Sequence, residues 1–287
     1  MKPDRRRQEA VDIASFYGIM GASPTILTQS RSSTTTSRLR GYKRILLAMD
    51  YTGTLCEIGA DECLPEIVFA LNRLSQLPQV TMALVTGCCG SELSRITRGL
   101  PPLWTISDHG RACNLPDGRS MSDWPSHAGT GPIDSAWFQA EDNLQGLPVR
   151  LQRKRFGVAV HTLVDALQPS DQQRLAQWTA VCRSFGMEIL SGRRIVEALI
   201  PGFDKRRALL RLSAHLRSEY RIYAGDDVSD ITTLTEVSRR PDGFGIYVSS
   251  PQRPEPGARV SAVVEGPMGF AAALTELAEV LEGVPGI

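Results

Sequence analysis

The stretch Ile45-Leu-Leu-Ala-Met-Asp-Tyr-Thr-Gly-Thr-Leu55 decides the fold of this chain of 287 residues. It begins with a continuous apolar run, which is typical of a strand buried on both faces of a parallel sheet. Asp50 follows that run directly, at a strand end where α/β proteins place their ligands. Gly53 allows a tight turn whose backbone amides can hold a phosphate. The stretch therefore predicts an α/β fold with a functional carboxylate at the end of a strand.

Buried strands and amphipathic helices alternate on both sides of the middle of the chain. Apolar runs predict the strands, and apolar residues that recur every three to four positions predict the helices. The first group comprises a helix opened by Pro65, a strand over 80–85, a short helix over 90–99 and a strand over 103–106. The second comprises helices over about 204–218, 228–237 and 268–282 and strands over 221–224, 244–248 and 262–265. Together these elements predict a parallel-sheet core.

The middle of the chain, from about Leu115 to Pro201, has a different pattern. A loop rich in Gly, Pro and Asp leads to a strand-like stretch over 156–160, and a helix is predicted over 170–184. Strands over 187–190 and 194–199 flank Ser191-Gly192, which predicts a hairpin turn at that pair. We therefore expect a lid-like α+β insert with a β-β-α-β-β arrangement.

These patterns divide the chain into three parts. Residues 1–40 include a polar run of Ser, Thr and Arg over 30–38, which predicts a flexible N-terminal tail. The core domain is predicted over 41–115 and 201–287, and the cap domain over 116–200.

Composition excludes several classes of partner and leaves others open. The formal net charge of +1 gives no reason to expect nucleic acid or a membrane, and no apolar run is long enough to span a bilayer. The spacing of the six cysteines fits neither a zinc site nor a disulfide framework, so reduced thiols in a cytoplasmic protein are expected. The oligomeric state stays open.

Polar groups stand at several of the predicted strand and helix ends. Thr86-Gly87 ends the second predicted strand, Lys205 lies at the start of a helix, and Gly225-Asp226-Asp227-Val-Ser-Asp230 closes another strand. Each group alone is more simply a cap, a turn or a surface charge. Because carboxylates are typical ligands of hard cations and the groups recur at successive element ends, their joint order predicts a cation site beside a phosphate pocket.

These runs, together with Asp50-Tyr-Thr-Gly-Thr-Leu55, resemble the four motifs of haloacid dehalogenase-like (HAD) phosphatases. Further detail is similar to the trehalose-6-phosphate phosphatase family. That detail comprises His109-Gly110, Lys154 with His161 beyond it, Arg194-Ile-Val-Glu197 and Gly202-Phe-Asp-Lys205. The resemblance covers roughly residues 42–283 and implies a HAD-type Rossmann-like core with an inserted α+β cap.

The resemblance also implies the chemistry of the matched core positions. Asp50 would be the nucleophile that forms an aspartyl-phosphate. Mg²⁺ would be held by Asp50, the carbonyl of Thr52 and Asp226, with Asp227 and Asp230 supporting it. The phosphoryl group would be bound by Thr86 and Gly87 and its charge offset by Lys205.

The cap would recognise the sugar of a small-molecule sugar phosphate. The family uses a Glu-x-Lys pair and a later Glu, and these positions are Gln152, Lys154 and Glu197 here. His109 follows a predicted strand end and is expected to border the site. His161, within an apolar stretch, is expected to be a packed and hydrogen-bonded residue.

Thr52 is the largest departure from the family pattern, which has Asp at this position as general acid and base. Losing such a group typically costs a factor on the order of 10²–10⁴ in rate. Either another group serves as the acid, or the aspartyl-phosphate turns over slowly, or the protein binds sugar phosphates with little turnover. A phosphatase, even a slow one, ranks first because every implied metal and phosphate ligand is present.

Smaller departures bear on the substrate. Gln152 replaces an acid, so a charge-assisted hydrogen bond becomes a neutral one. Cys88, Leu199 and Arg206 also differ from the residues that the family usually has. The substrate is then trehalose 6-phosphate or a related compound, such as the pseudo-disaccharide validoxylamine 7′-phosphate. Drift at tolerant positions explains these changes equally well.

Overall fold

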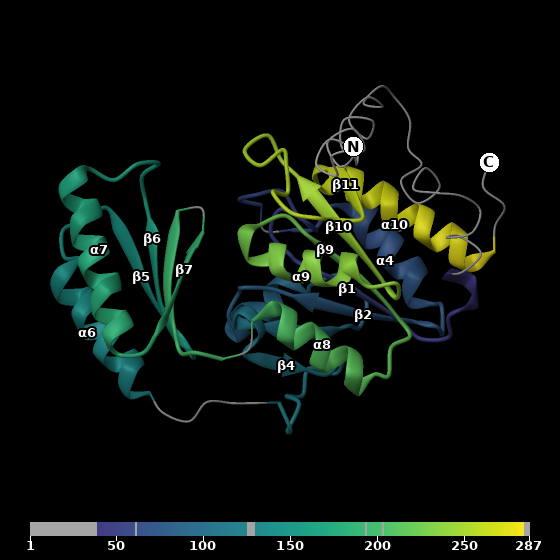
Figure 1. Ribbon diagram of the computed structural model, residues 1–287, viewed down its shortest axis with the longest axis horizontal. Helices are drawn as coiled ribbons and strands as arrows, with labels where there is room; N and C mark the ends of the chain where they lie inside the picture. Colours follow the sequence, from purple (N-terminus) through teal and green to yellow (C-terminus); the bar gives the residue numbers. More distant parts are fainter. Residues whose placement is uncertain (1–38, 61, 125–129, 193, 203, 284–287) are drawn as a thin grey trace, which may run out of the picture.

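The computed structural model describes residues 39–60, 62–124, 130–192, 194–202 and 204–283. These residues form a core built on one sheet and a cap built on a second (Figure 1). The predicted tail, residues 1–40, lies outside the described residues except for its last two positions. Leu39 is buried, and Arg40 Nε donates a hydrogen bond to Val280 O, so these two positions pack on the core.

The core sheet has seven strands in the order β11-β10-β9-β1-β2-β3-β4. Their bounds are β1 Ile45–Met49, β2 Val80–Val85, β3 Trp104–Ser107, β4 Ala112–Asn114, β9 Tyr220–Gly225, β10 Gly243–Ser249 and β11 Ala262–Glu265. All neighbouring pairs are parallel except β3 and β4. Met49 lies opposite both Leu84 and Ala224, so β1, β2 and β9 end together at one edge of the sheet.

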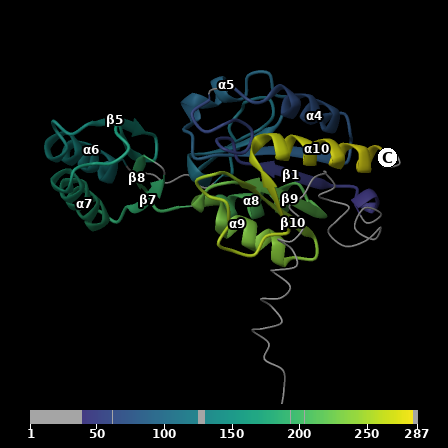
Figure 2. The same cartoon turned by 90° about the horizontal axis from the view of Figure 1, so that it is seen from above.

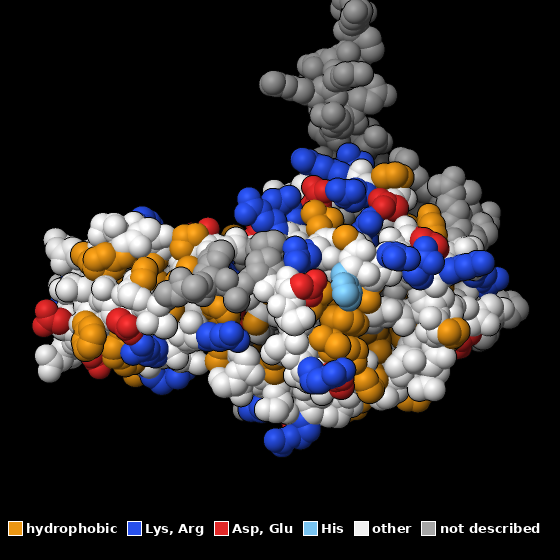
Figure 3. Space-filling model, turned by 90° about the horizontal axis from the view of Figure 1, so that it is seen from below, with side chains coloured by type: hydrophobic (Ala, Val, Ile, Leu, Met, Phe, Trp, Pro, Cys, Tyr) orange, Lys and Arg blue, Asp and Glu red, His pale blue; other side chains and the backbone are white. Residues whose placement is uncertain are grey.

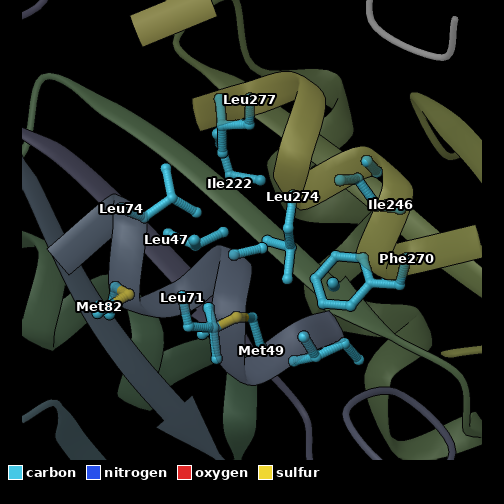
Figure 4. Close-up of a cluster of buried hydrophobic side chains, with 14 of the residues drawn as sticks. Leu47, Met49, Leu71, Leu74, Met82, Ile222, Ile246, Phe270, Leu274 and Leu277 are labelled. Carbon is cyan, nitrogen blue, oxygen red and sulfur yellow. The ribbon is translucent and has the colours of Figure 1, made fainter. Parts of the chain in front are cut away.

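Helices cover both faces of this sheet, as the apolar runs in its strands predict (Figure 2). One face carries α4 (Pro65–Ser75), α5 (Leu93–Ile96) and α10 (Gly266–Glu282). The other carries α8 (Lys205–His215) and α9 (Val228–Arg239). Figure 4 shows the first layer, where Leu71 of α4 and Phe270 and Leu274 of α10 pack against the central strands.

The cap has an antiparallel sheet of four strands in the order β5-β6-β8-β7. Its elements are α6 (Gly131–Asn143), β5 (Val149–Lys154), β6 (Gly157–Thr162), α7 (Pro169–Ser184), β7 (Glu188–Gly192) and β8 (Ile195–Leu199). Fully buried Trp178 lies at the centre of the cluster between the two helices and the sheet, and its Nε1 donates to Ala136 O at 3.0 Å.

The cap corrects two sequence-based expectations. The segment expected to be a loop after Leu115 contains α6 and β5, so the cap order is α-β-β-α-β-β. α6 begins at Gly131-Pro132, two residues that signal a turn but are tolerated at a helix start. The predicted hairpin exists, but Gly192 pairs with Ile195, so Ser191-Gly192 ends β7 instead of forming the turn.

The described surface carries charges of both signs, as the small formal net charge of the chain suggests. Basic and acidic side chains are interspersed on the face of the core and cap drawn in Figure 3. Among the described helices, none combines the length and the apolar character that a membrane crossing requires. All six cysteines are free thiols.

Candidate active site

One cavity of about 540 Å³ between the core and the cap collects every candidate site residue. Its lining includes Asp50, Thr52, Thr86, Gly87, His109, Gln152, Lys154, Glu197, Lys205, Asp226 and Asp227. These residues come from the ends of β1, β2 and β9, from the turn after β3, from the start of α8 and from cap strands β5 and β8. The core sheet therefore brings together residues that are far apart in the sequence.

Three buried carboxylates and one ammonium group form the centre of the site. Oxygen atoms of Asp50, Asp226 and Asp230 lie within 4.8 Å of one another. Lys205 Nζ donates hydrogen bonds of 2.8 Å to Asp50 Oδ1 and 2.8 Å to Asp230 Oδ1. With all three carboxylates ionised, a single ammonium leaves an excess of two negative charges. This set of hard oxygen donors fits a divalent cation such as Mg²⁺.

The carboxylates disfavour one another's ionised forms in the absence of a cation. Burial, opposed by the charge of Lys205, raises the pKa of Asp50 to about 6. Burial and the charges of Asp50 and Asp230 raise the pKa of Asp226 to about 8. A divalent cation in this position would reverse both shifts by favouring the ionised carboxylates.

The turn after Asp50 depends on glycine. Gly53 has φ of +83°, and a Cβ at this position would overlap the carboxylate of Asp226. Thr54 Oγ1 donates to Asp226 Oδ1 at 3.2 Å, which holds that carboxylate beside the turn. Thr52 lies between Asp50 and this glycine, and it is an exposed residue that lines the cavity.

Asp227 and Asp230 have different surroundings, which the sequence did not separate. Asp227 lines the cavity but lies outside the group of three carboxylates and forms an ion pair with Arg253. Asp230 belongs to the group and accepts hydrogen bonds from Lys205 and from Tyr223 Oη. Asp227 is the N-cap residue of α9 and Asp230 lies three positions later, so the two residues form a capping box.

A second turn, at the end of β2, provides the expected phosphate ligands. Thr86 is buried, and its Oγ1 accepts a hydrogen bond from Cys88 N at 3.1 Å. Gly87 lies against the ring of His109, where any Cβ would overlap the imidazole. His109 is held there by the 3-10 turn η2 (Asp108–Gly110), in which Asp108 has φ of +52° and His109 of +57°.

The cap reaches this turn through Lys154 and Glu197. Lys154 Nζ donates to Glu197 Oε1 at 2.6 Å and to Gly87 O at 3.2 Å. Glu197 Oε2 lies 2.7 Å from His109 Nε2. Burial opposes the charge of Glu197, but its bonds to His109 and Lys154 lower its pKa to about 2. The carboxylate therefore stays ionised and links the cap to the core.

Gln152 and His161 form a neutral pair on the same cap sheet. Gln152 Oε1 lies 2.9 Å from His161 Nε2, and Gln152 Nε2 donates weakly to Cys89 Sγ at 3.8 Å. His161 is hydrogen-bonded as expected, but it is only half-buried and lines the cavity. Burial lowers the pKa of His161, which favours the uncharged ring.

Several lining residues escaped the sequence analysis. Among them are Glu92 and Arg253. Arg253 lies on the loop between β10 and β11, where Ser250 and Arg253 form an isolated bridge. No residue pattern in the loops that carry these side chains distinguishes them from ordinary surface charges.

The parallel core sheet, the carboxylates at its strand ends and the inserted cap define a haloacid dehalogenase-like protein. The C-terminal domain of trehalose-6-phosphate phosphatase from C. albicans has the same fold, with a TM-score of 0.69 and 16% identity. The match covers 90% of this chain and 99% of that one.

The family follows from the sequence comparison. The family model "Trehalose-phosphatase" matches residues 48–261, so the chain belongs to the trehalose-phosphatase family. It is 28% identical to trehalose-phosphate phosphatase of Mycobacterium leprae over 75% of this chain and 52% of that protein. It is 29% identical to a trehalose-6-phosphate phosphatase-related protein of Thermoplasma acidophilum over 64% of this chain and 79% of that protein. The chain thus spans about half the length of the M. leprae relative.

Proposed function

We propose that the chain is an Mg²⁺-dependent phosphatase that hydrolyses a disaccharide phosphate through an aspartyl-phosphate at Asp50. The observation that carries the proposal is the group of Asp50, Asp226 and Asp230 around Lys205, in a cavity that the cap closes with polar side chains. Membership of the trehalose-phosphatase family supports the reaction class. The six free thiols are typical of a reducing compartment, which supports a cytoplasmic location.

In this mechanism each core residue has a distinct role. Asp50 attacks phosphorus, while Lys205 holds the attacking carboxylate in place and offsets phosphoryl charge. Asp50, Asp226, Asp230 and the carbonyl of Thr52 would hold Mg²⁺, which supplies positive charge to the phosphoryl oxygens. The hydroxyl of Thr86 and the amide of Gly87 would bind those oxygens from the second turn.

The cap would select the sugar. Lys154 and Glu197 are both buried and charged, and Gln152 adds an amide that can donate and accept hydrogen bonds. Such polar groups at one end of a cavity of this size suit a ligand rich in hydroxyl groups. Trehalose 6-phosphate is the first candidate, and validoxylamine 7′-phosphate is the second because Gln152 replaces the acid of the family pattern.

A second candidate function is sugar-phosphate binding with little turnover. Thr52 favours it, since a hydroxyl cannot replace the carboxylic acid that the family has two positions after its nucleophile. Saturable binding of a disaccharide phosphate without phosphate release would support this alternative.

Phosphate release measured with and without Mg²⁺ tests the proposal. Trehalose 6-phosphate, validoxylamine 7′-phosphate and hexose phosphates are compared, with Asp50→Asn as the inactive control. Release that needs both Mg²⁺ and Asp50 supports a phosphatase. A folded protein that binds these compounds by calorimetry yet releases no phosphate supports the binding function instead.

A further inference from the structure

We infer that His109 supplies the proton that Thr52 cannot, first as the acid for the leaving sugar and then as the base for the attacking water. This inference rests on the proposed phosphatase function. It follows from comparing the surroundings of every ionisable side chain that lines the cavity.

The acidic groups and the thiol of the cavity are already committed. Asp227 is ion-paired with Arg253, and Glu92 Oε2 accepts from Cys89 N at 2.9 Å. Glu197 is ionised because of its two bonded partners, and burial raises the pKa of the Cys88 thiol. Asp50 and Asp226 belong to the proposed nucleophile and cation site. The carboxylates are therefore held in other contacts or roles, and a thiol with a raised pKa holds its proton too tightly to serve as an acid near neutral pH.

Among the basic groups that line the cavity, two imidazoles are left as candidate proton donors. Lys154 and Lys205 are each held by buried carboxylates, which raise the pKa of both ammonium groups despite their burial. His161 lies on β6 of the cap, bound to Gln152, and is uncharged near neutral pH. His109 is the remaining group of this kind in the described cavity lining.

The position of His109 suits the task. Its backbone N donates to Thr86 O at 3.1 Å, and its ring lies against Gly87, so the imidazole is fixed beside the expected phosphate ligands. Asp108 and His109 both have positive φ, a conformation that side-chain-bearing residues rarely adopt and that clusters at functional sites.

Glu197 fixes which imidazole nitrogen carries the proton. Its Oε2 lies 2.7 Å from His109 Nε2, and an ionised carboxylate can only accept a hydrogen bond. Nε2 therefore carries a proton in this contact and is the atom from which that proton can be transferred. The sugar oxygen would take the place of Glu197 Oε2 on Nε2.

Over one turnover, His109 gives up one proton and takes up another. As Asp50 bonds to phosphorus and the bond from phosphorus to the sugar oxygen breaks, Nε2–H of the imidazolium gives its proton to that oxygen. The neutral ring then takes a proton from water, whose oxygen bonds to phosphorus as the Asp50–phosphorus bond breaks. Asp50 and the imidazolium are restored, and inorganic phosphate leaves.

The test compares two leaving groups in His109→Asn. Asparagine tolerates the left-handed backbone of position 109, so the variant removes the acid while keeping the turn. We expect kcat for the sugar phosphate to fall by a factor on the order of 10²–10⁴, since a sugar alkoxide needs the proton. Hydrolysis of p-nitrophenyl phosphate, whose phenolate leaves unprotonated, should fall less than about tenfold at pH 7 in its phosphoenzyme-forming burst. Adding Thr52→Asp to this variant should restore most of the sugar-phosphate rate.

Three controls separate the outcomes. His215→Asn makes the same change at an exposed position outside the cavity and should leave both rates unchanged. Equal losses of both substrates in the phosphoenzyme-forming burst of His109→Asn, or no loss with the sugar phosphate, would overturn the role of His109 while leaving the phosphatase intact. A wild-type protein without Mg²⁺-dependent release from either substrate would overturn the proposed function and this inference with it.

Discussion

Lys205 Nζ lies 2.8 Å from Asp50 Oδ1, although the two residues are 155 positions apart in the chain. β1 delivers the carboxylate and the start of α8 delivers the ammonium, immediately after the chain returns from the cap. The pair of Asp50 and Lys205 thus forms only when the two halves of the core assemble around the insert.

Removing this ammonium should destabilise the protein and inactivate it. Lys205→Met leaves Asp50 and Asp230 buried without their cation, which typically costs about 3–5 kcal/mol. Because these carboxylates can protonate instead, the loss should be smaller at pH 5 than at pH 8. Urea unfolding at both pH values measures it. Arg207→Met, an exposed neighbour on α8, should change the free energy of unfolding by less than about 0.5 kcal/mol.

Mg²⁺ should stabilise the chelator-treated protein, and increasingly so as the pH rises from 6 to 8. Without a cation, the raised pKa values of Asp50 and Asp226 mean that the folded state holds protons which the unfolded state has released, so stability falls over this range. Mg²⁺ binds the ionised carboxylates and removes that loss. Thermal unfolding with and without Mg²⁺ tests this. A shift in Tm that is independent of pH, or one that survives Asp226→Asn, would contradict the proposed cation site.

Gly53→Ala and Gly59→Ala form a matched pair. Both glycines have positive φ, +83° and +89°, so alanine strains either turn by roughly 1 kcal/mol. A Cβ at position 59 has nothing within 4 Å, whereas one at position 53 would displace the Asp226 carboxylate. We therefore expect only Gly53→Ala to weaken the stabilisation by Mg²⁺, as titrations followed by thermal unfolding would show. Equal weakening in both variants would assign the effect to backbone strain.

Glu197 should contribute stability that depends on acid pH. Its pKa falls from 4.5 to about 2 on folding, which corresponds to about 3 kcal/mol. A depressed acid pKa stabilises the fold above 4.5, and that contribution disappears as the pH falls toward 2. Glu197→Gln should therefore be destabilised at pH 7 and approach the wild type at pH 3, as measured by urea unfolding. Glu141→Gln, on the exposed face of α6, is the control and should show no such dependence.

The sequence predicted the core better than the cap, for a physical reason. Core strands such as β1 are buried on both faces and appear as uninterrupted apolar runs. In β5, by contrast, Arg150 and Arg153 are exposed between partly buried residues, so no such run marks the strand. Its pairing with β6 depends on contacts that only the folded cap provides.

The contacts within the site were likewise predicted only in part. Motif order predicted that Asp50, Thr86, Lys205 and Asp226 would come together, because parallel strands end at one edge of the sheet. It could not distinguish Asp227 from Asp230, since helix geometry and the partner Arg253 decide which carboxylate turns inward. The contact from Glu197 of the cap to His109 of the core was likewise hidden, because it forms only when the two parts are assembled.

In the proposed mechanism, the two sheets also divide recognition from reactivity. The core alone contributes Asp50, Lys205 and Asp226, and the cap alone contributes Gln152 and Lys154. Replacing the cap should therefore change the substrate selectivity and leave the core residues of the site in place, provided that the new cap keeps a carboxylate opposite His109. Glu197 is therefore the cap residue whose carboxylate any replacement cap domain must retain.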